Sequence, residues 1–117
     1  HPDELNAHGS VEPARFVAAL AQHGGHLDGS VGEVSHLALC PILDENAHHI
    51  VLQTEHGTAT LILLPKTRAT TEKPIVREGF SVTVMPLREG SLGILTDSPE
   101  RSRKVESLLR SHILWES

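Results

Sequence analysis

The sequence predicts an α+β domain with about five mainly antiparallel strands in one sheet and a packing helix near each chain end. Two β-branched apolar runs flank Glu55-His56-Gly57 within residues 48–65, HHIVLQTEHGTATLILLP, which is the pattern of a β-hairpin. The connections between the predicted strands are short, and short connections favour antiparallel pairing over crossover units. Apolar residues recur at helical spacing in two segments, one toward each end of the chain.

The first 32 residues predict a leader, a helix and a turn region. Residues 1–9 are polar, and we expect them to form a flexible leader of a single domain that spans residues 1–117. Ser10 or Glu12 can cap a helix with Pro13 in its first turn. Phe16, Val17 and Leu20 follow at helical spacing, Gly24-Gly25 supplies a stop, and residues 26–32 are rich in glycine.

Strands are predicted at 34–41, 48–54, 58–64, 81–87 and 91–96, with a short edge element over 75–80 that Gly79 interrupts. Polar triplets, Asp44-Glu45-Asn46 and Arg88-Glu89-Gly90, predict turns. Residues 65–73 are charged and rich in threonine without apolar periodicity, so we expect a mobile loop there.

The final helix is predicted from a start signal and an apolar stripe. Asp97 and Glu100 have the spacing of a capping box, and Pro99 suits the first turn. A stripe that packs on the sheet follows, made of Val105, Leu108, Leu109, His112 and Ile113. From the combined periodicities we expect a core that includes Phe16, Leu20, Val51, Leu61, Leu63, Val82, Val84, Leu108 and Ile113.

Composition limits the class of protein. The chain has 117 residues, 38% of them hydrophobic, which suits one soluble globular domain. Its net charge of −5 and scattered basic residues argue against nucleic acid as a partner. No apolar run approaches the roughly 20 residues that span a bilayer, and no signal peptide is present. The chain begins at His1, which leads us to expect an excised fragment whose membrane anchor lies outside it.

Cys40 and His48 are the strongest candidate for chemistry. If the first two strands pair across the intervening turn, these side chains lie nearly opposite each other, and a thiolate with an imidazole can bind Zn or Cu. A single cysteine forms no intrachain disulfide, and a free cysteine is most often a small buried core residue. The metal-responsive reading is therefore the alternative, and we expect no cofactor.

Catalysis has little support in the sequence. Asp28, Ser30, Ser35 and His36 supply the residue types of a hydrolase triad by composition alone, and this is kept as a remote alternative. The sequence holds no nucleophile-elbow motif and no zinc-protease motif. We therefore expect a protein that is not an enzyme.

Several segments carry a resemblance to a known family: HPDELNAH (1–8), VSHLALCPI (34–42), the hairpin at 48–65 and GSLGIL (90–95). Together they resemble the C-terminal part of an uncharacterised proteobacterial family of membrane-tethered, anti-sigma-factor-like proteins. The resemblance implies a soluble domain on the periplasmic side of the inner membrane, joined to the membrane only through a segment outside this chain. It supplies no catalytic residues.

These observations lead to one expected function. We expect a non-enzymatic extracytoplasmic sensing or interaction domain of a membrane-anchored regulatory protein. Its partner, a second copy or another protein, is expected at an exposed sheet edge or at the 65–73 loop, because edge strands carry free N–H and C=O groups.

Overall fold

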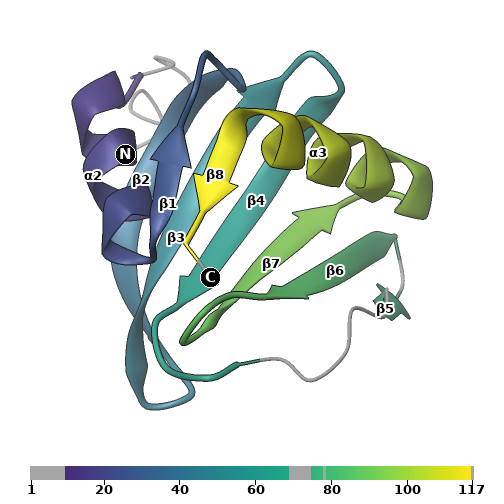
Figure 1. Cartoon of the computed structure of the whole chain (residues 1–117). Helices are drawn as coiled ribbons and strands as arrows, with labels where there is room; N and C mark the ends of the chain where they lie inside the picture. The colour runs from purple at the N-terminus through teal and green to yellow at the C-terminus, as the bar shows by residue number, and fades with distance from the viewer. Residues whose placement is uncertain (1–9, 69–74, 78, 117) are drawn as a thin grey trace.

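The computed structural model describes residues 10–68, 75–77 and 79–116. The elements follow in the order α2 (Pro13–Gln22), β1 (Gly25–Leu27), β2 (Glu33–Ile42), β3 (Glu45–Thr54), β4 (Gly57–Leu64), β5 (Ile75–Arg77), β6 (Phe80–Pro86), β7 (Ser91–Thr96), α3 (Pro99–His112) and β8 (Ile113–Trp115). Six strands form one antiparallel sheet in the order β2-β3-β4-β7-β6-β5, and β1 pairs with β8 in a second sheet (Figure 1). The α+β class and the mainly antiparallel pairing are confirmed.

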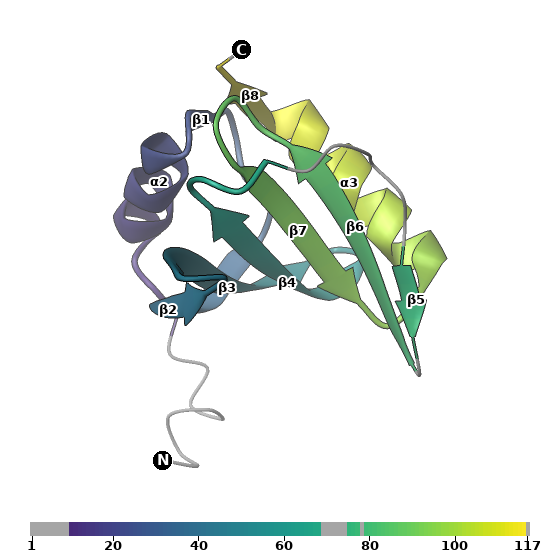
Figure 2. The same ribbon diagram turned by 90° about the horizontal axis from the view of Figure 1, so that it is seen from below.

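Both helices and the small sheet cover one face of the six-stranded sheet. Figures 1 and 2 show α2 at the β2 end, α3 along β6 and β7, and the β1–β8 pair between the helices. The core fills the space between these layers, because the strands alternate their side chains between the two faces of the sheet. Ile50, Leu61 and Ile94 lie side by side across three paired strands, and each is at most 1% exposed.

The predicted core is partly right. Phe16, Leu20, Leu61, Leu63 and Ile113 are buried, and Leu108 is partly buried against them. Val51, Val82 and Val84 instead lie on the opposite face, where they are half-buried. On β6 the core side is taken by Ser81, Thr83 and Met85, so the valines do not mark it.

The β2–β3 and β3–β4 hairpins have tight two-residue turns. The predicted hairpin around Glu55-His56-Gly57 is confirmed, with Thr54 paired to Gly57. The preceding turn consists of Leu43 and Asp44, whose φ angles of 52° and 62° give both central residues the left-handed conformation of a type I′ turn. Glu45 and Asn46 therefore belong to β3 rather than to the predicted polar turn.

The prediction of a single sheet is wrong, because β1 and β8 form a second one. Gly25–Leu27 spans the end of the predicted Gly24-Gly25 stop and the start of the predicted glycine-rich region 26–32, and Ile113 falls on the predicted helical stripe. The helix actually ends at His112, and Ile113 is its extended C-cap, so the chain continues past the last helix into a strand. A Cβ at Gly25 would come within 2.6 Å of the Trp115 ring, so the glycine makes room for the tryptophan.

The helix starts also differ in detail from the prediction. Ser98, not Asp97, is the N-cap of α3, and its hydroxyl accepts a hydrogen bond from the backbone N–H of Arg101. Asp97 forms an ion pair with the Arg101 guanidinium at 2.6 Å. In α2, Pro13 occupies the first turn as predicted, and the N-cap Glu12 makes no side-chain capping bond.

Candidate functional site

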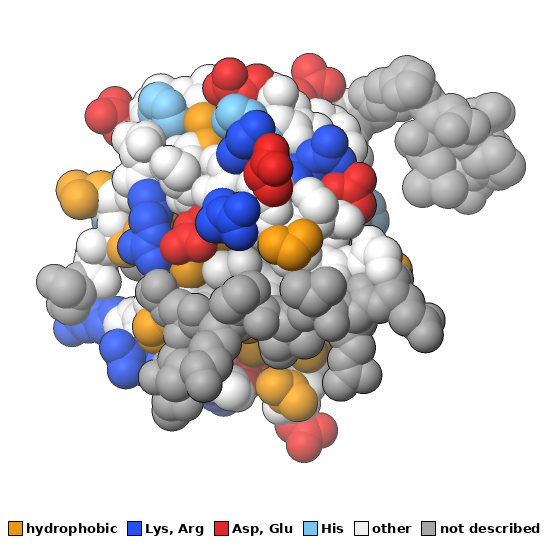
Figure 3. Space-filling view, turned by 90° about the vertical axis from the view of Figure 1, so that its right-hand side faces the viewer, with side chains coloured by type: hydrophobic (Ala, Val, Ile, Leu, Met, Phe, Trp, Pro, Cys, Tyr) orange, Lys and Arg blue, Asp and Glu red, His pale blue; other side chains and the backbone are white. Residues whose placement is uncertain are grey.

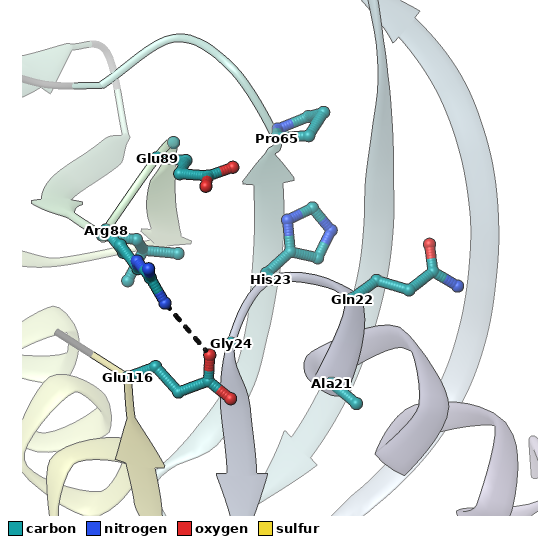
Figure 4. Close-up of a pocket in the computed structure, with 10 residues that line it drawn as sticks. Ala21, Gln22, His23, Gly24, Pro65, Arg88, Glu89 and Glu116 are labelled. Atoms are coloured by element: carbon teal, nitrogen blue, oxygen red, sulfur yellow. Dashed lines mark ion pairs between the residues drawn. The ribbon is translucent and has the colours of Figure 1, made fainter.

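A polar cavity of about 150 Å³ opens at the C-terminal end of α2. Its walls are the helix end at residues 21–24, Pro65 after β4, the turn at residues 87–90 and Glu116 (Figure 4). Glu116 forms part of the wall and makes two polar contacts. One carboxylate oxygen lies 2.8 Å from His26 Nε2, and the other lies 3.6 Å from the Arg88 guanidinium. These contacts join the β1–β8 pair to the β6–β7 turn.

Two histidines meet beside this cavity. His23 is the C-cap of α2, and His48 lies on β3 with its ring on the core side of the sheet. His23 Nε2 and His48 Nδ1 are 2.8 Å apart, and the rings meet edge to face. Burial, reinforced by the neighbouring His48, lowers the pKa of His23 to about 4, and burial also lowers the pKa of His48. Both rings are therefore neutral at pH 7, and their hydrogen bond attaches the end of α2 to the sheet.

The structure does not bring Cys40 and His48 together. Cys40 pairs with Ala47, and His48 pairs with Leu39, so the register is offset by one residue from the predicted one. Neighbouring residues of a strand point to opposite faces, which places the Cys40 thiol and the His48 ring on opposite sides of the sheet. In this register the two side chains cannot share a metal ion. Within the described residues, no group of three or more His, Cys, Asp or Glu side chains could hold one.

The residues of the remote hydrolase alternative have other contacts. The Ser35 hydroxyl donates to the Val51 carbonyl and accepts from the Gln53 amide. Ser30 accepts from the Gly32 N–H, while the His36 ring meets that of His49 edge to face. No serine–histidine hydrogen bond joins these residues in the described part of the chain.

The described part of the predicted 65–73 loop is bound to the sheet. The Glu45 carboxylate accepts hydrogen bonds from the Lys66 N–H at 2.7 Å, from the Thr67 N–H and from the Thr67 hydroxyl. These bonds, the Thr67 hydroxyl first, lower the pKa of Glu45. Arg68 Nε donates to the Leu87 carbonyl at 2.6 Å. Residues 69–73 of the predicted loop lie outside the described residues.

The outer edge of β2 is the other feature of functional interest. Among the described residues, no strand pairs with this edge of the six-stranded sheet. Leu39 lies three residues before the end of β2, and its side chain is 60% exposed although it is on the core side of the sheet. Unpaired backbone groups beside an exposed apolar side chain form a template for another strand.

The two helices expose different kinds of surface. Ion pairs four residues apart lie on and just before α3, such as Arg101 with Asp97 and Lys104 with Glu100. Figure 3 shows Lys and Arg side chains beside Asp and Glu side chains on one face of the molecule. The exposed positions of α2 are instead mostly small and apolar: Ala14, Val17, Ala18 and Ala21. A helix that is apolar on its solvent side is typical of one that packs against a further partner.

Comparisons with known proteins identify the family but no function. A family model described as a protein of unknown function (DUF3379) matches residues 3–113, so the chain belongs to that family. No curated protein and no solved structure matches the chain. No helix within the described residues is long and apolar enough to cross a membrane.

Proposed function

We propose that this member of the DUF3379 family is a non-enzymatic sensing or interaction domain of a membrane-anchored regulatory protein, placed on the periplasmic side of the inner membrane. The observation that carries the proposal is the surface formed by the open edge of β2, with exposed Leu39, and the apolar outer face of α2. Burial of such a surface against a partner stabilises a complex, whereas its exposure serves no purpose in folding.

The membrane-anchored and anti-sigma-factor-like parts of the proposal are supported by the resemblance of four sequence segments. In such a protein this domain binds a partner outside the cytoplasm, and the change passes to the cytoplasm through a segment that precedes the domain. The domain therefore supplies recognition, and the regulatory activity belongs to another region.

The proposal is tested in the natural full-length protein by site-specific photo-crosslinking in its native membrane. A photoreactive amino acid at Leu39 is compared with one at Leu114, which is 73% exposed but lies on β8, away from β2. We expect a protein adduct from position 39 and none from position 114. Equal labelling from both positions, or none from position 39, would contradict the assigned surface. Protease added to the periplasmic side should also cleave the domain, and complete protection would contradict its placement.

A further inference from the structure

We infer that the partner of the β2 edge is a second copy of this chain, joined in antiparallel register about a twofold axis at Leu39. The inference rests on the proposed interaction surface and specifies what binds there. It follows from the backbone groups that β2 leaves open, which match one another only in this arrangement.

The tight turn determines which groups of β2 point outward. A two-residue hairpin closes on a hydrogen-bonded pair, here Ile42 with Glu45. Because hydrogen-bonded positions alternate along an antiparallel pair, residues 36, 38 and 40 bond to β3. The N–H and C=O groups of residues 37 and 39, and the C=O of Pro41, therefore point to the open edge.

Two contacts agree with this assignment and show that two outward carbonyls of the edge already have donors. The Val11 N–H donates to the Val34 carbonyl at 2.8 Å, and an Arg15 nitrogen lies 3.4 Å from the Leu37 carbonyl. Both acceptors point outward, and a bulge between Val34 and His36 accounts for their odd spacing. Among the described residues, the groups of this edge that remain open are the N–H of Leu37, both groups of Leu39 and the C=O of Pro41.

The unpaired N–H and C=O groups of β2 can all pair with the same groups of a second copy. When Leu39 faces Leu39 of a second copy, each residue donates to and accepts from the other. Leu37 then faces Pro41, so the Leu37 N–H meets a free Pro41 carbonyl on both sides of the axis. Pro41 has no N–H to donate, and the Leu37 carbonyl opposite it already accepts from Arg15. No donor or acceptor in the paired stretch is left without a partner.

The side chains fit the same register. The exposed Leu39 side chains of the two copies meet directly opposite each other on the α2 side of the joined sheet. On the other face, Ala38 faces Cys40 of the second copy, and both side chains are small. The α2 flank next to the edge carries Arg15 and, one turn later, Ala18, whose small side chain leaves room for the α2 helix of the second copy.

Sedimentation of the purified 117-residue chain over a concentration series tests the association. The pairing covers only five residues of each strand, so the dimer belongs to the weak, concentration-dependent class. We expect Leu39→Lys to weaken dimerisation by at least about tenfold, because a charge on an edge strand opposes pairing. Leu114→Lys removes a comparably exposed leucine from β8 and should leave dimerisation unchanged.

Disulfide formation tests the register. In the proposed dimer, Ala38 and Cys40 form a pair without mutual hydrogen bonds, with Cα atoms about 4.5 Å apart, which is within the range that a disulfide spans. Mild oxidation with diamide should therefore link Ala38→Cys into a covalent dimer, and adding Cys40→Ser should abolish the link. The unsubstituted chain should stay unlinked, because its two Cys40 residues lie on a diagonal about 7–8 Å apart. His36→Cys, on the same strand and face, is the matched control.

The outcomes separate this inference from the proposed function. A chain that stays monomeric at every concentration, or a His36→Cys chain that links instead of Ala38→Cys, would overturn the twofold pairing at Leu39. If the photo-crosslink from position 39 then joins a different protein, the interaction surface stands and only the second copy is wrong. Dimerisation that responds equally to Leu39→Lys and Leu114→Lys would also overturn the inference.

Discussion

His23 Nε2 and His48 Nδ1 lie 2.8 Å apart, so two residues 25 positions apart in sequence form one hydrogen bond between α2 and β3. His23 also lines the polar cavity, whose charged lining residues are Arg88 and Glu89 of the β6–β7 turn and Glu116 after β8 (Figure 4). Since Leu39 pairs with His48 across the β2–β3 ladder, the histidine contact also determines where α2 ends relative to the open edge.

The first prediction concerns acid stability. Burial lowers the pKa of His23 from its ordinary value of 6.5 to about 4 in the folded chain. His23 is therefore protonated below about pH 6.5 in the unfolded chain but only below about pH 4 in the folded chain. The free energy of unfolding should fall as the pH falls across this window and level off below it. The largest loss of unfolding free energy that this shift can cause is roughly 3 kcal/mol, and solvent screening at the half-buried His23 ring makes the actual loss smaller.

Chemical denaturation at a series of pH values measures this effect. Between pH 6.5 and 4, His23→Gln should make the free energy of unfolding depend less on pH. The control His26→Gln, at an exposed histidine, should keep most of that pH dependence. An unchanged slope in His23→Gln would mean that other groups cause the acid sensitivity.

The second prediction separates the two faces of the sheet. Leu61 is 1% exposed in the core, and Leu61→Asp should unfold the chain because it buries an unpaired charge. Val51 is half-buried on the other face, so Val51→Asp should cost substantially less and leave a cooperative thermal transition. Circular dichroism melts of the two variants make the comparison, and equal losses would contradict the assignment of faces.

The third prediction compares two glycines of one hairpin. A Cβ at Gly90 would lie 1.7 Å from the Leu64 carbonyl oxygen, whereas a Cβ at Gly93 would have its nearest neighbour at 3.8 Å. Gly90→Ala should therefore destabilise the fold by about 2 kcal/mol or more, since the backbone must shift. Gly93→Ala should be neutral or stabilising by up to about 1 kcal/mol, because glycine weakens a strand. Denaturant midpoints distinguish the two, and tolerance of Gly90→Ala would count against this close approach.

The fourth prediction tests which residue caps α3. Ser98→Ala removes the hydroxyl that accepts from the Arg101 N–H and should cost about 1 kcal/mol. Asp97→Ala breaks only an exposed ion pair and should cost about 0.5 kcal/mol or less. The free energies of unfolding of the two variants provide the measurement. If Asp97→Ala lowered the free energy of unfolding more than Ser98→Ala, Asp97 would be the N-cap, as the sequence pattern predicts.

The sequence is sufficient to predict elements that carry their own local signal. The 48–65 hairpin has β-branched runs on both sides of a glycine turn, and the α3 stripe repeats over several turns. β1 and β8 are three residues long and pair across about 90 positions, so no local periodicity reveals them. On β6 the buried positions are Ser81, Thr83 and Met85, which inverts the usual rule that apolar residues mark the core.

The candidate site depends on register, which the sequence leaves open. A shift of one residue at the Leu43-Asp44 turn separates Cys40 from His48, because the side-chain period of a strand is two. The His23–His48 contact has no motif, since one residue ends a helix and the other lies on a strand. The open edge could be anticipated in general terms, but its position on β2 requires the strand order.

The two ends of the six-stranded sheet are unequal in length, and this inequality limits how large an assembly can grow. The β2 end offers a ten-residue strand, while β5 at the other end has three residues. Head-to-tail polymerisation would require β2 of one copy to pair with β5 of the next, which leaves most of the longer strand unmatched. In the proposed dimer, pairing of β2 with β2 uses the open backbone groups of both long edges and leaves the three-residue β5 edges at the two ends of the joined sheet, which disfavours further growth. A protein crowded on a surface could thus associate without forming fibres.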